Sequence, residues 1–136
     1  MKKSYRTLEF SFIQDYIKNY CFSEMAKKRI DQIKPFQDID DLKLYQDDIS
    51  SAMKIIYAYG RIPLAPYEDI KEILQKAQKG GVCYPQDLLK IVQILKNVQE
   101  VQAYLDQEIE QSHLLEILSL LYLPKDLYNE ILKCVD

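Results

Sequence analysis

The sequence predicts an all-α protein, an elongated bundle of about six or seven helices. Apolar residues recur at steps of three and four through most of the chain, which is the period of a helix with one buried face. Prolines and glycines stand at the ends of these periodic segments, where they stop or start helices. No segment shows the sustained alternation of a strand, and no internal repeat is visible.

Two short helices are expected first. Ser11 followed by Gln14 has the spacing of a capping box, which predicts a helix from about Phe12 to Tyr20. Ser23 can cap a second helix, and Pro35 cannot continue it. The apolar residues of this second helix are Met25, Ala26, Ile30 and Ile33.

The clearest periodic segment lies between Asp38 and Gly60. Its apolar side chains, expected to face the core, are Leu42, Tyr45, Ile49, Ala52, Ile56 and Tyr59. Acidic residues favour the positive start of a helix, and glycine tolerates the geometry that ends one. The expected helix has about 22 residues and is roughly 33 Å long.

The next segment carries two prolines, Pro63 and Pro66, which predict an extended connection from Gly60 to Tyr67. A shorter helix follows and ends at Gly80. Its apolar stripe is Ile70, Ile73, Leu74 and Ala77.

A second long helix is expected from Pro85, since proline fits the first helical turn. Its heptad-like seam is Leu88, Ile91, Leu95, Val98, Leu105 and Ile109, interrupted by Gln102 and widened by Leu89, Val92 and Val101. Tyr84 offers this helix no small hydroxyl cap. We expect the helix to exceed about 30 Å.

The last third begins with an interruption of the pattern around Gln111 and Ser112. Leu114 to Leu121 is then apolar almost all round, which indicates burial on several sides or a missing partner. Pro124 fits the first turn of a final helix. Its stripe is Leu127, Tyr128, Ile131, Leu132 and Val135. The stripe still runs where the sequence stops, so we expect an excised piece of a larger protein.

Composition favours one intracellular domain over residues 1–136. The chain carries 18 basic and 21 acidic side chains, whereas a module that grips nucleic acid alone usually has a net basic face. Apolar runs are too short to cross a bilayer, and no secretory signal follows the basic start Met1-Lys2-Lys3-Ser4. The odd set Cys21, Cys83 and Cys134 predicts buried thiols in a reducing compartment. We therefore expect a cytoplasmic protein without a membrane partner.

Little in the sequence predicts catalysis. His113 is the single histidine, and a lone histidine at a helix start is more often a cap or surface residue than an acid–base group. No cysteine stands in a recognisable nucleophile motif, although a Cys-His pair stays open. Lys79-Gly80-Gly81 lacks the spacing of a phosphate-binding loop. We expect no enzyme activity in this fragment, and no catalytic, cofactor-binding or metal residue.

Other chemistry-bearing groups have simpler interpretations. The acidic pairs Asp40-Asp41, Asp47-Asp48 and Glu68-Asp69 lack the alternate spacing of calcium ligands, so first-turn and solvated-face charges are favoured. Eleven tyrosines provide possible base-stacking rings, but Tyr45 and Tyr59 are expected in core or rim packing. The densest basic cluster, Lys27-Lys28-Arg29, is expected on a solvated helix face.

Short matches in a fixed order give the chain a family resemblance. The matching pieces are Thr7-Leu8-Glu9-Phe10, Ser23-Glu24-Met25-Ala26-Lys27, Ile33-Lys34-Pro35 with Asp38, Gly60-Arg61-Ile62-Pro63-Leu64, Ile70, Leu74-Gln75-Lys76-Ala77, Lys79-Gly80-Gly81-Val82, and Pro85 through Leu88-Leu89-Lys90-Ile91. Together they resemble the N-terminal segment of the second-type bacterial MutS proteins, the MutS-two branch. The chain departs from that pattern at Ala26, at Ala65-Pro66-Tyr67 and at Tyr84. After residue 100 it matches only in helical character.

The resemblance implies a role and not a site. Such proteins look like homodimeric ATPases in which N-terminal helices form a core and lever region joined to a clamp, with a small nuclease domain much later. They are associated with branched or recombination-intermediate DNA and with stalled ribosomes. ATP and Mg²⁺ would belong to the ATPase domain, whose motifs this chain lacks. The implied partners are the remainder of the parent chain and, through it, DNA or the ribosome, with a homodimer expected.

Three functional classes stay open at this stage. The first is a structural module that transmits motion in a nucleic-acid-associated ATPase. The alternative is a stand-alone helical adaptor that binds a partner protein through Leu114 to Leu123. The third is a small enzyme, whose turnover would depend on His113 or a cysteine.

Overall fold

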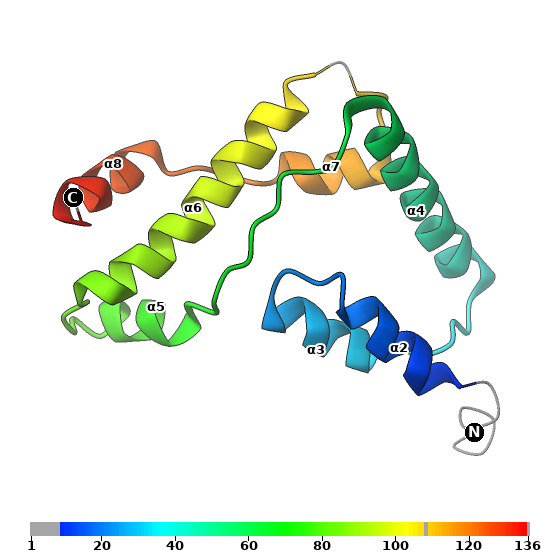
Figure 1. Ribbon diagram of the computed structural model, residues 1–136, viewed down its shortest axis with the longest axis horizontal. Coiled ribbons are helices and arrows are strands. Elements are labelled where there is room, and N and C mark those ends of the chain that lie inside the picture. Colours follow the sequence, from blue (N-terminus) through cyan, green and yellow to red (C-terminus); the bar gives the residue numbers. More distant parts are fainter. Residues whose placement is uncertain (1–8, 108, 136) are drawn as a thin grey trace. The chain divides into compact units, whose positions relative to one another are not determined.

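The computed structural model describes residues 9–107 and 109–135 (Figure 1). Within these residues the chain forms seven helices and no strand, which confirms the predicted all-α helical bundle. The chain divides into two compact units. One is Met1–Pro35 with Pro66–Asp69, and the other is Phe36–Ala65 with Ile70–Asp136. The expectation of a single domain over 1–136 stays a prediction.

The first unit holds α2 (Phe10–Lys18) and α3 (Glu24–Gln32), which pack against each other. The predicted cap of α3 is confirmed, because the Ser23 hydroxyl oxygen accepts the Ala26 amide at 3.1 Å. Thr7 and Leu8, which belong to the family resemblance, and the basic start of the chain lie outside the described residues.

The capping box predicted for the first helix is wrong. α2 begins at Phe10, so Ser11 is already inside it, and the N-cap residue Glu9 makes no side-chain cap bond. The Gln14 amide donates instead to the Ile30 carbonyl at 2.8 Å, in the last turn of α3. Carbonyls in a last helical turn run short of partners within their helix, which gives Gln14 a better acceptor than the end of its own helix.

The second unit holds the other five helices. They are α4 (Ile39–Tyr59), α5 (Lys71–Gln78), α6 (Pro85–Leu105), α7 (His113–Ser119) and α8 (Lys125–Val135). Among them α6 packs with α8, and α4 packs with α7. The two long helices therefore each pack along a shorter helix, and not along each other as paired rods.

At the start of each long helix, an acidic side chain accepts a hydrogen bond from a backbone amide. Asp38 accepts the Asp40 amide at 2.7 Å at the start of α4. At the start of α6 the Asp87 carboxylate accepts the Tyr84 amide at 3.0 Å, while Tyr84 itself supplies no side-chain cap, as predicted. α4 ends as predicted at Gly60, whose φ of 82° lies in the left-handed region that glycine tolerates.

The second long helix is shorter than predicted, because α6 ends at Leu105 and does not reach Ile109. The residues that follow Leu105 are polar for most of a turn, so no apolar packing favours another turn. The Gln107 side chain also donates to the Tyr104 carbonyl at 3.0 Å, which satisfies a carbonyl of the last turn. Pro124 lies just before α8 and accepts the Tyr128 amide at 2.9 Å, so the proline starts that helix from outside it.

The predicted extended connection is confirmed, since residues 60–70 contain no helix. α5 ends as predicted near Gly80, at a φ of 77°. The next glycine, Gly81, allows the backbone to lie close to Lys76 of α5. The Gly81 amide donates to the Lys76 carbonyl at 2.9 Å, and a Cβ on Gly81 would lie 2.8 Å from the Lys76 Cγ.

The buried core of the described residues is small. Its apolar members are Ile55, Ile73, Val101, Leu123 and Ile131, and its polar members are Ser23 and Asn97. On α4 the buried residue is Ile55, and the neighbouring Ile56 of the predicted stripe is 46% exposed. The predicted core face of α4 is therefore wrong at its centre, because α4 packs through a face rotated by about one residue, about 100°. No described helix has the length and apolar character needed to span a membrane.

Candidate docking faces

Three residues of the predicted stripe of α4 form an exposed apolar face, while Leu42, Ala52 and Tyr59 are half-buried. We call Tyr45, Ile49 and Ile56 the α4 face; their exposed fractions are 57%, 59% and 46%. Tyr45 has one aromatic neighbour, Phe36, with ring centroids 4.9 Å apart, which is rim packing. The other large apolar side chains exposed on α4 are Ile39, Leu44, Met53 and Tyr57.

The side of α4 that packs on α7 is more polar than its stripe. Both carboxylate oxygens of Asp48 lie 3.0 Å from Nδ1 of His113, and the buried Ile55 follows two helical turns later on the same side of α4. An open hollow of about 460 Å³ lies between α4 and residues 109–112, lined by polar groups that include Asp47, Lys54 and Ser112. The Asp48–His113 pair therefore joins α4 to α7, while Tyr45, Ile49 and Ile56 stay exposed.

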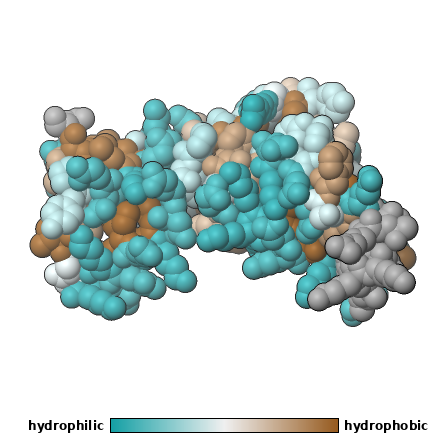
Figure 2. Space-filling view, turned by 60° about the horizontal axis from the view of Figure 1, so that its bottom comes forward, coloured by the Kyte–Doolittle hydropathy of each residue, from teal (hydrophilic) through white to brown (hydrophobic). Residues whose placement is uncertain are grey.

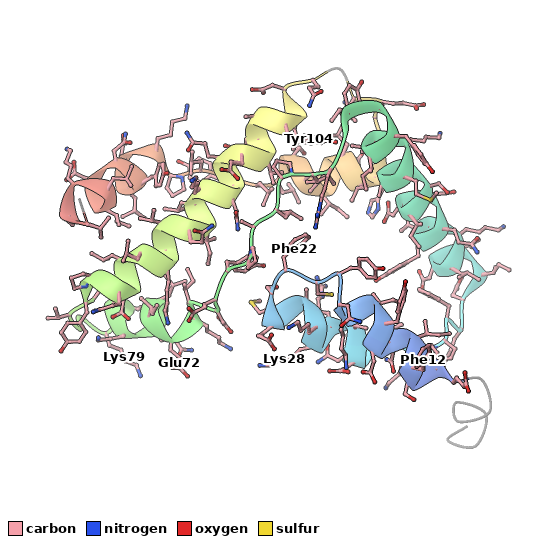
Figure 3. The ribbon with its side chains drawn as sticks, in the orientation of Figure 1. Phe12, Phe22, Lys28, Glu72, Lys79 and Tyr104 are labelled. Carbon is pink, nitrogen blue, oxygen red and sulfur yellow. The ribbon has the colours of Figure 1, made fainter. Side chains whose placement is uncertain are left out.

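A second exposed apolar face lies on α2. We call Phe12, Ile13, Tyr16, Ile17 and Tyr20 the α2 face; each of these side chains is at least 40% exposed. Their spacing of one, three and four places them on one side of a helix. Phe12 is labelled on α2 in Figure 3, and Figure 2 shows apolar surface exposed in several places among hydrophilic side chains.

The side of α2 that meets α3 is polar. Lys18 forms ion pairs with Asp31 of α3 and, at 3.0 Å, with Asp15 of α2. The hydrogen bond to Asp31, followed by that to Asp15, raises the pKa of Lys18 above its ordinary value. With the amide of Gln14 these pairs make a polar joint between the two helices. The apolar side of α2 is consequently left on the surface.

Two further groups of the first unit have shifted pKa values with local causes. The hydroxyls of Tyr16 and Tyr20 lie 3.0 Å apart, and this hydrogen bond raises the pKa of Tyr20. A hydrogen bond from Lys27, 2.7 Å away, lowers the pKa of Glu24. Lys27 of the basic cluster is thus paired within its own helix, and Lys28 and Arg29 are exposed as predicted.

The surface predicted for an adaptor, Leu114 to Leu123, is divided in the structure. Leu120 and Tyr122, which join α7 to α8, are 81% and 78% exposed. Leu123 is buried, and the carbonyl of Leu121 accepts a hydrogen bond from Gln102 at 2.8 Å. Only part of this segment is therefore available to a partner.

The residues weighed for chemistry lie apart from one another. His113 starts α7 and pairs with Asp48, so it ties α7 to α4. Cys21 and Cys83 are half-buried and Cys134 of α8 is exposed, so the prediction of buried thiols is wrong for Cys134. In the described part of the chain no group of three or more histidine, cysteine or acidic side chains is placed to hold a metal.

Most of the acidic pairs and the tyrosines have the places that the simpler interpretation favours, but Asp48 does not, because it is half-buried and paired with His113. Asp40 and Asp41 lie in the first turn of α4. Tyr59 is half-buried near the end of the same helix, and Tyr45 lies on the rim with Phe36. These positions fit helix-start charges and side-chain packing.

Sequence reasoning missed three polar side chains of α6. Asn97 is 5% exposed and bonds to the backbone of Ala65; Tyr104 bonds to the carbonyl of Gly60; and Gln102 bonds to that of Leu121. Asn97 and Tyr104 are seven residues apart, which places them on one face of a helix. Asn97 and Tyr104 each stand one position away from the predicted seam of α6, and Gln102 interrupts it. These placements were the signal in the sequence that could have revealed their role.

Comparisons with known proteins relate the chain to one part of longer proteins. No family model matches it. It is 32% identical over 133 residues to a protein named Endonuclease MutS2 from Clostridium botulinum (strain Alaska E43), covering 96% of this chain and 17% of that protein. A protein of the same name from Clostridium beijerinckii is 30% identical over 137 residues, covering 98% of this chain and 17% of that protein. A protein of the same name from Clostridium kluyveri is 31% identical over 104 residues, covering 76% of this chain and 13% of that protein.

These matches support the resemblance drawn from the sequence motifs at the level of a segment. The chain spans 17% of the length of the first two of these relatives. Over nearly all of its own length, this chain is similar to one segment of the proteins named Endonuclease MutS2.

Proposed function

We propose that the chain is the N-terminal core and lever module of a MutS2-like, DNA-associated ATPase. It couples the state of the ATPase dimer to a clamp that holds nucleic acid or a ribosome, and does no chemistry of its own. ATP and Mg²⁺ belong to a domain elsewhere in the parent protein. The observation that carries the proposal is the exposed α4 face on a chain that matches only one segment of much longer relatives.

The α4 face has the pattern of a helix that packs against another helix. Its residues are four and seven positions apart within a stripe of three-and-four steps, which is the spacing of an interhelical seam. Burial of apolar surface contributes about 25 cal/mol per Å², so leaving such a seam in water forfeits stability. Contiguous exposed apolar surface marks an interaction site, and the remainder of a longer chain supplies the partner.

The two long helices fit a role in transmitting motion. α4 and α6 each have 21 residues, so each is about 31 Å long and internally hydrogen-bonded. Such helices move as rigid bodies, and small rotations at packed interfaces carry a change of state over their length. Closure of an ATPase dimer can therefore reach a distant clamp through helices of this kind.

Protection of the α4 face tests the proposal. Ile49→Cys and the matched control Lys43→Cys are placed in a background in which the three natural cysteines are serine. Each is labelled with a maleimide in the 136-residue chain and in the protein made from the natural reading frame. We expect Ile49→Cys to react at least about tenfold more slowly in the longer protein, because packing excludes reagent, and Lys43→Cys to react equally in both. Equal rates for Ile49→Cys in the two contexts contradict the proposal.

The coupling role has a separate readout in the longer protein. Ile49→Glu and Ile56→Glu should leave ATP hydrolysis present and reduce its response to nucleic acid, because the lever and not the ATPase site is altered. The isolated chain should hold branched DNA weakly. A submicromolar affinity at physiological salt that disappears when Lys27, Lys28 and Arg29 are neutralised would argue for direct binding by this module.

The stand-alone adaptor is the second candidate, and the exposure of Leu120 and Tyr122 favours it. An adaptor is encoded by a reading frame that ends after these residues, whereas the module continues into a phosphate-binding-loop motif. An adaptor also stays monodisperse and binds one partner, with Leu120→Ser and Tyr122→Ser abolishing binding.

A further inference from the structure

The strap, residues Gly60–Ala65, crosses from the end of α4 along α6 within the second unit (Figure 1). At the far end of the strap, both polar groups of the Asn97 side chain form hydrogen bonds with the backbone of Ala65. Asn97 Nδ2 donates to the Ala65 carbonyl at 2.8 Å, and the Ala65 amide donates to Asn97 Oδ1 at 3.3 Å. Asn97 is 5% exposed, so these bonds satisfy an amide that water does not reach.

The near end of the strap is held from the same helix. The Tyr104 hydroxyl donates to the Gly60 carbonyl at 2.8 Å, and Figure 3 shows Tyr104 in the C-terminal part of α6, beside the start of the strap. Asn97 and Tyr104 lie two helical turns apart on one face, about 10.5 Å along the axis. Five extended residues span about 16 Å, so the strap reaches both points with slack.

Two prolines restrict the backbone shape of the strap. Proline at position 63 has no amide to donate, and the residues before Pro63 and Pro66 are restricted to extended conformations. The strap contains no helix and has no strand beside it in the described residues, so side-chain bonds from Asn97 and Tyr104 take the place of a backbone ladder, and Ile62 and Pro63 are half-buried. This restriction would keep a detached strap extended, so its reattachment would cost little backbone entropy.

We propose that the strap is a releasable latch, with Asn97 and Tyr104 as positioning residues that lock α4 to α6 when it is closed. The Tyr104 hydroxyl also lies 3.5 Å from the Ile55 carbonyl of α4, so Tyr104 and the strap connect the two long helices, each of which packs on a different shorter helix. Closed, the latch makes α4 move with α6; open, it lets the two long helices move separately. The latch belongs to the second unit alone and does not depend on the proposed function.

Asn97→Asp tests the latch, because it keeps the size of the side chain and removes the donor to the Ala65 carbonyl. Hydrogen exchange is measured by mass spectrometry on peptides covering residues 61–65, α6 and α8. We expect protection of the strap to fall about tenfold while α6 and α8 keep theirs, because one buried hydrogen bond is replaced by a carboxylate facing a carbonyl. Trypsin should cut faster after Arg61 and at an unchanged rate after Lys96.

Three comparisons keep the test decisive. Gln99→Ala, an exposed position on the same helix, should change nothing. Tyr104→Phe, which loses one hydroxyl, should lower strap protection by a smaller factor. Lowering the pH to about 4 should restore protection to Asn97→Asp relative to the original protein at the same pH, since a protonated carboxyl regains a donor.

Two outcomes overturn the latch. Equal loss of protection in the strap, α6 and α8 makes Asn97 a residue of general stability and not of a local device. Unchanged strap protection in both Asn97→Asp and Tyr104→Phe shows that other contacts hold the strap.

Discussion

The two long helices have the same length and similar sequence patterns, but they are used differently. Each has 21 residues and starts on an acidic side chain. α6 packs on α8, buries Asn97 and Val101, and bonds to the strap and to Leu121. α4 packs on α7, buries Ile55 and leaves Tyr45, Ile49 and Ile56 of its apolar stripe exposed. Apolar periodicity therefore identifies a helix and its seam, but does not show that the seam has a partner in the same chain.

The difference has a physical cause in the polar side chains of α6. A buried amide such as Asn97 binds one backbone segment in one register, because leaving it unpaired is costly. An apolar stripe accepts any complementary surface, since the hydrophobic effect has no direction. α6 is thus committed to its neighbours within the unit, and the α4 face is available to a surface from elsewhere.

The largest expected effect separates two neighbouring isoleucines of α4. Ile55→Ala should lower the free energy of unfolding by about 2–5 kcal/mol, because it removes a buried side chain and leaves a cavity. Ile56→Ala should cost about 1 kcal/mol or less, since that side chain is already 46% exposed. Urea unfolding followed by circular dichroism at 222 nm measures both.

Equal losses for Ile55→Ala and Ile56→Ala would break the contrast between the helices, because they would mean that the stripe of α4 is buried in solution. Repeating the pair in the longer protein that the proposed function requires sharpens the contrast. If the α4 face is covered there, Ile56→Ala should lower the free energy of unfolding more in the longer protein than it does in the isolated chain.

An intermediate effect is expected at the start of α4. Asp38→Ala should cost about 1 kcal/mol, because the Asp40 amide loses its side-chain acceptor. Asp47→Ala, in the exposed middle of the same helix, is the control and should change stability by less than about 0.5 kcal/mol. Thermal unfolding of both variants provides the measurement. A loss for Asp47→Ala as large as that for Asp38→Ala would show that charge, and not capping, sets the stability of α4.

The smallest effect concerns the phenol that joins the two long helices. Burial, and then the nearby Tyr59, raises the pKa of Tyr104 above its ordinary value. A raised pKa in the folded state means that this contribution to stability is present below pH of about 10 and is lost as the pH rises through the folded value. Tyr104→Phe should therefore lose less stability than the original protein in urea titrations between about pH 9 and 11. Lys18 and Tyr20 also titrate in this range, but they contribute equally to both proteins and cancel in the comparison. If both proteins lose stability in parallel, Tyr104 is not the source of the pH dependence.

Local signals predicted most helix boundaries. Ser23 before α3, Asp38 before α4, Gly60 after it and Pro85 at the start of α6 act within one turn of their own position, so no distant residue was needed to interpret them. Ser11 shows the limit of such signals. Its spacing to Gln14 fits a cap, but an acceptor on α3 draws Gln14 away, and that acceptor is 16 residues along the chain.

The sequence by itself determined the all-α class, the order of the helices and the extended strap, because helix propensity, capping and proline geometry are properties of neighbouring residues. Tertiary structure decided which face of α4 is buried, that α6 is tied by Asn97 and Tyr104, and which apolar side chains stay exposed. These depend on where a distant segment arrives, and a difference of one residue in helical phase exchanges Ile55 for Ile56 in the core. Such a rotation preserves the period of the stripe, which is why the periodic pattern could not reveal it.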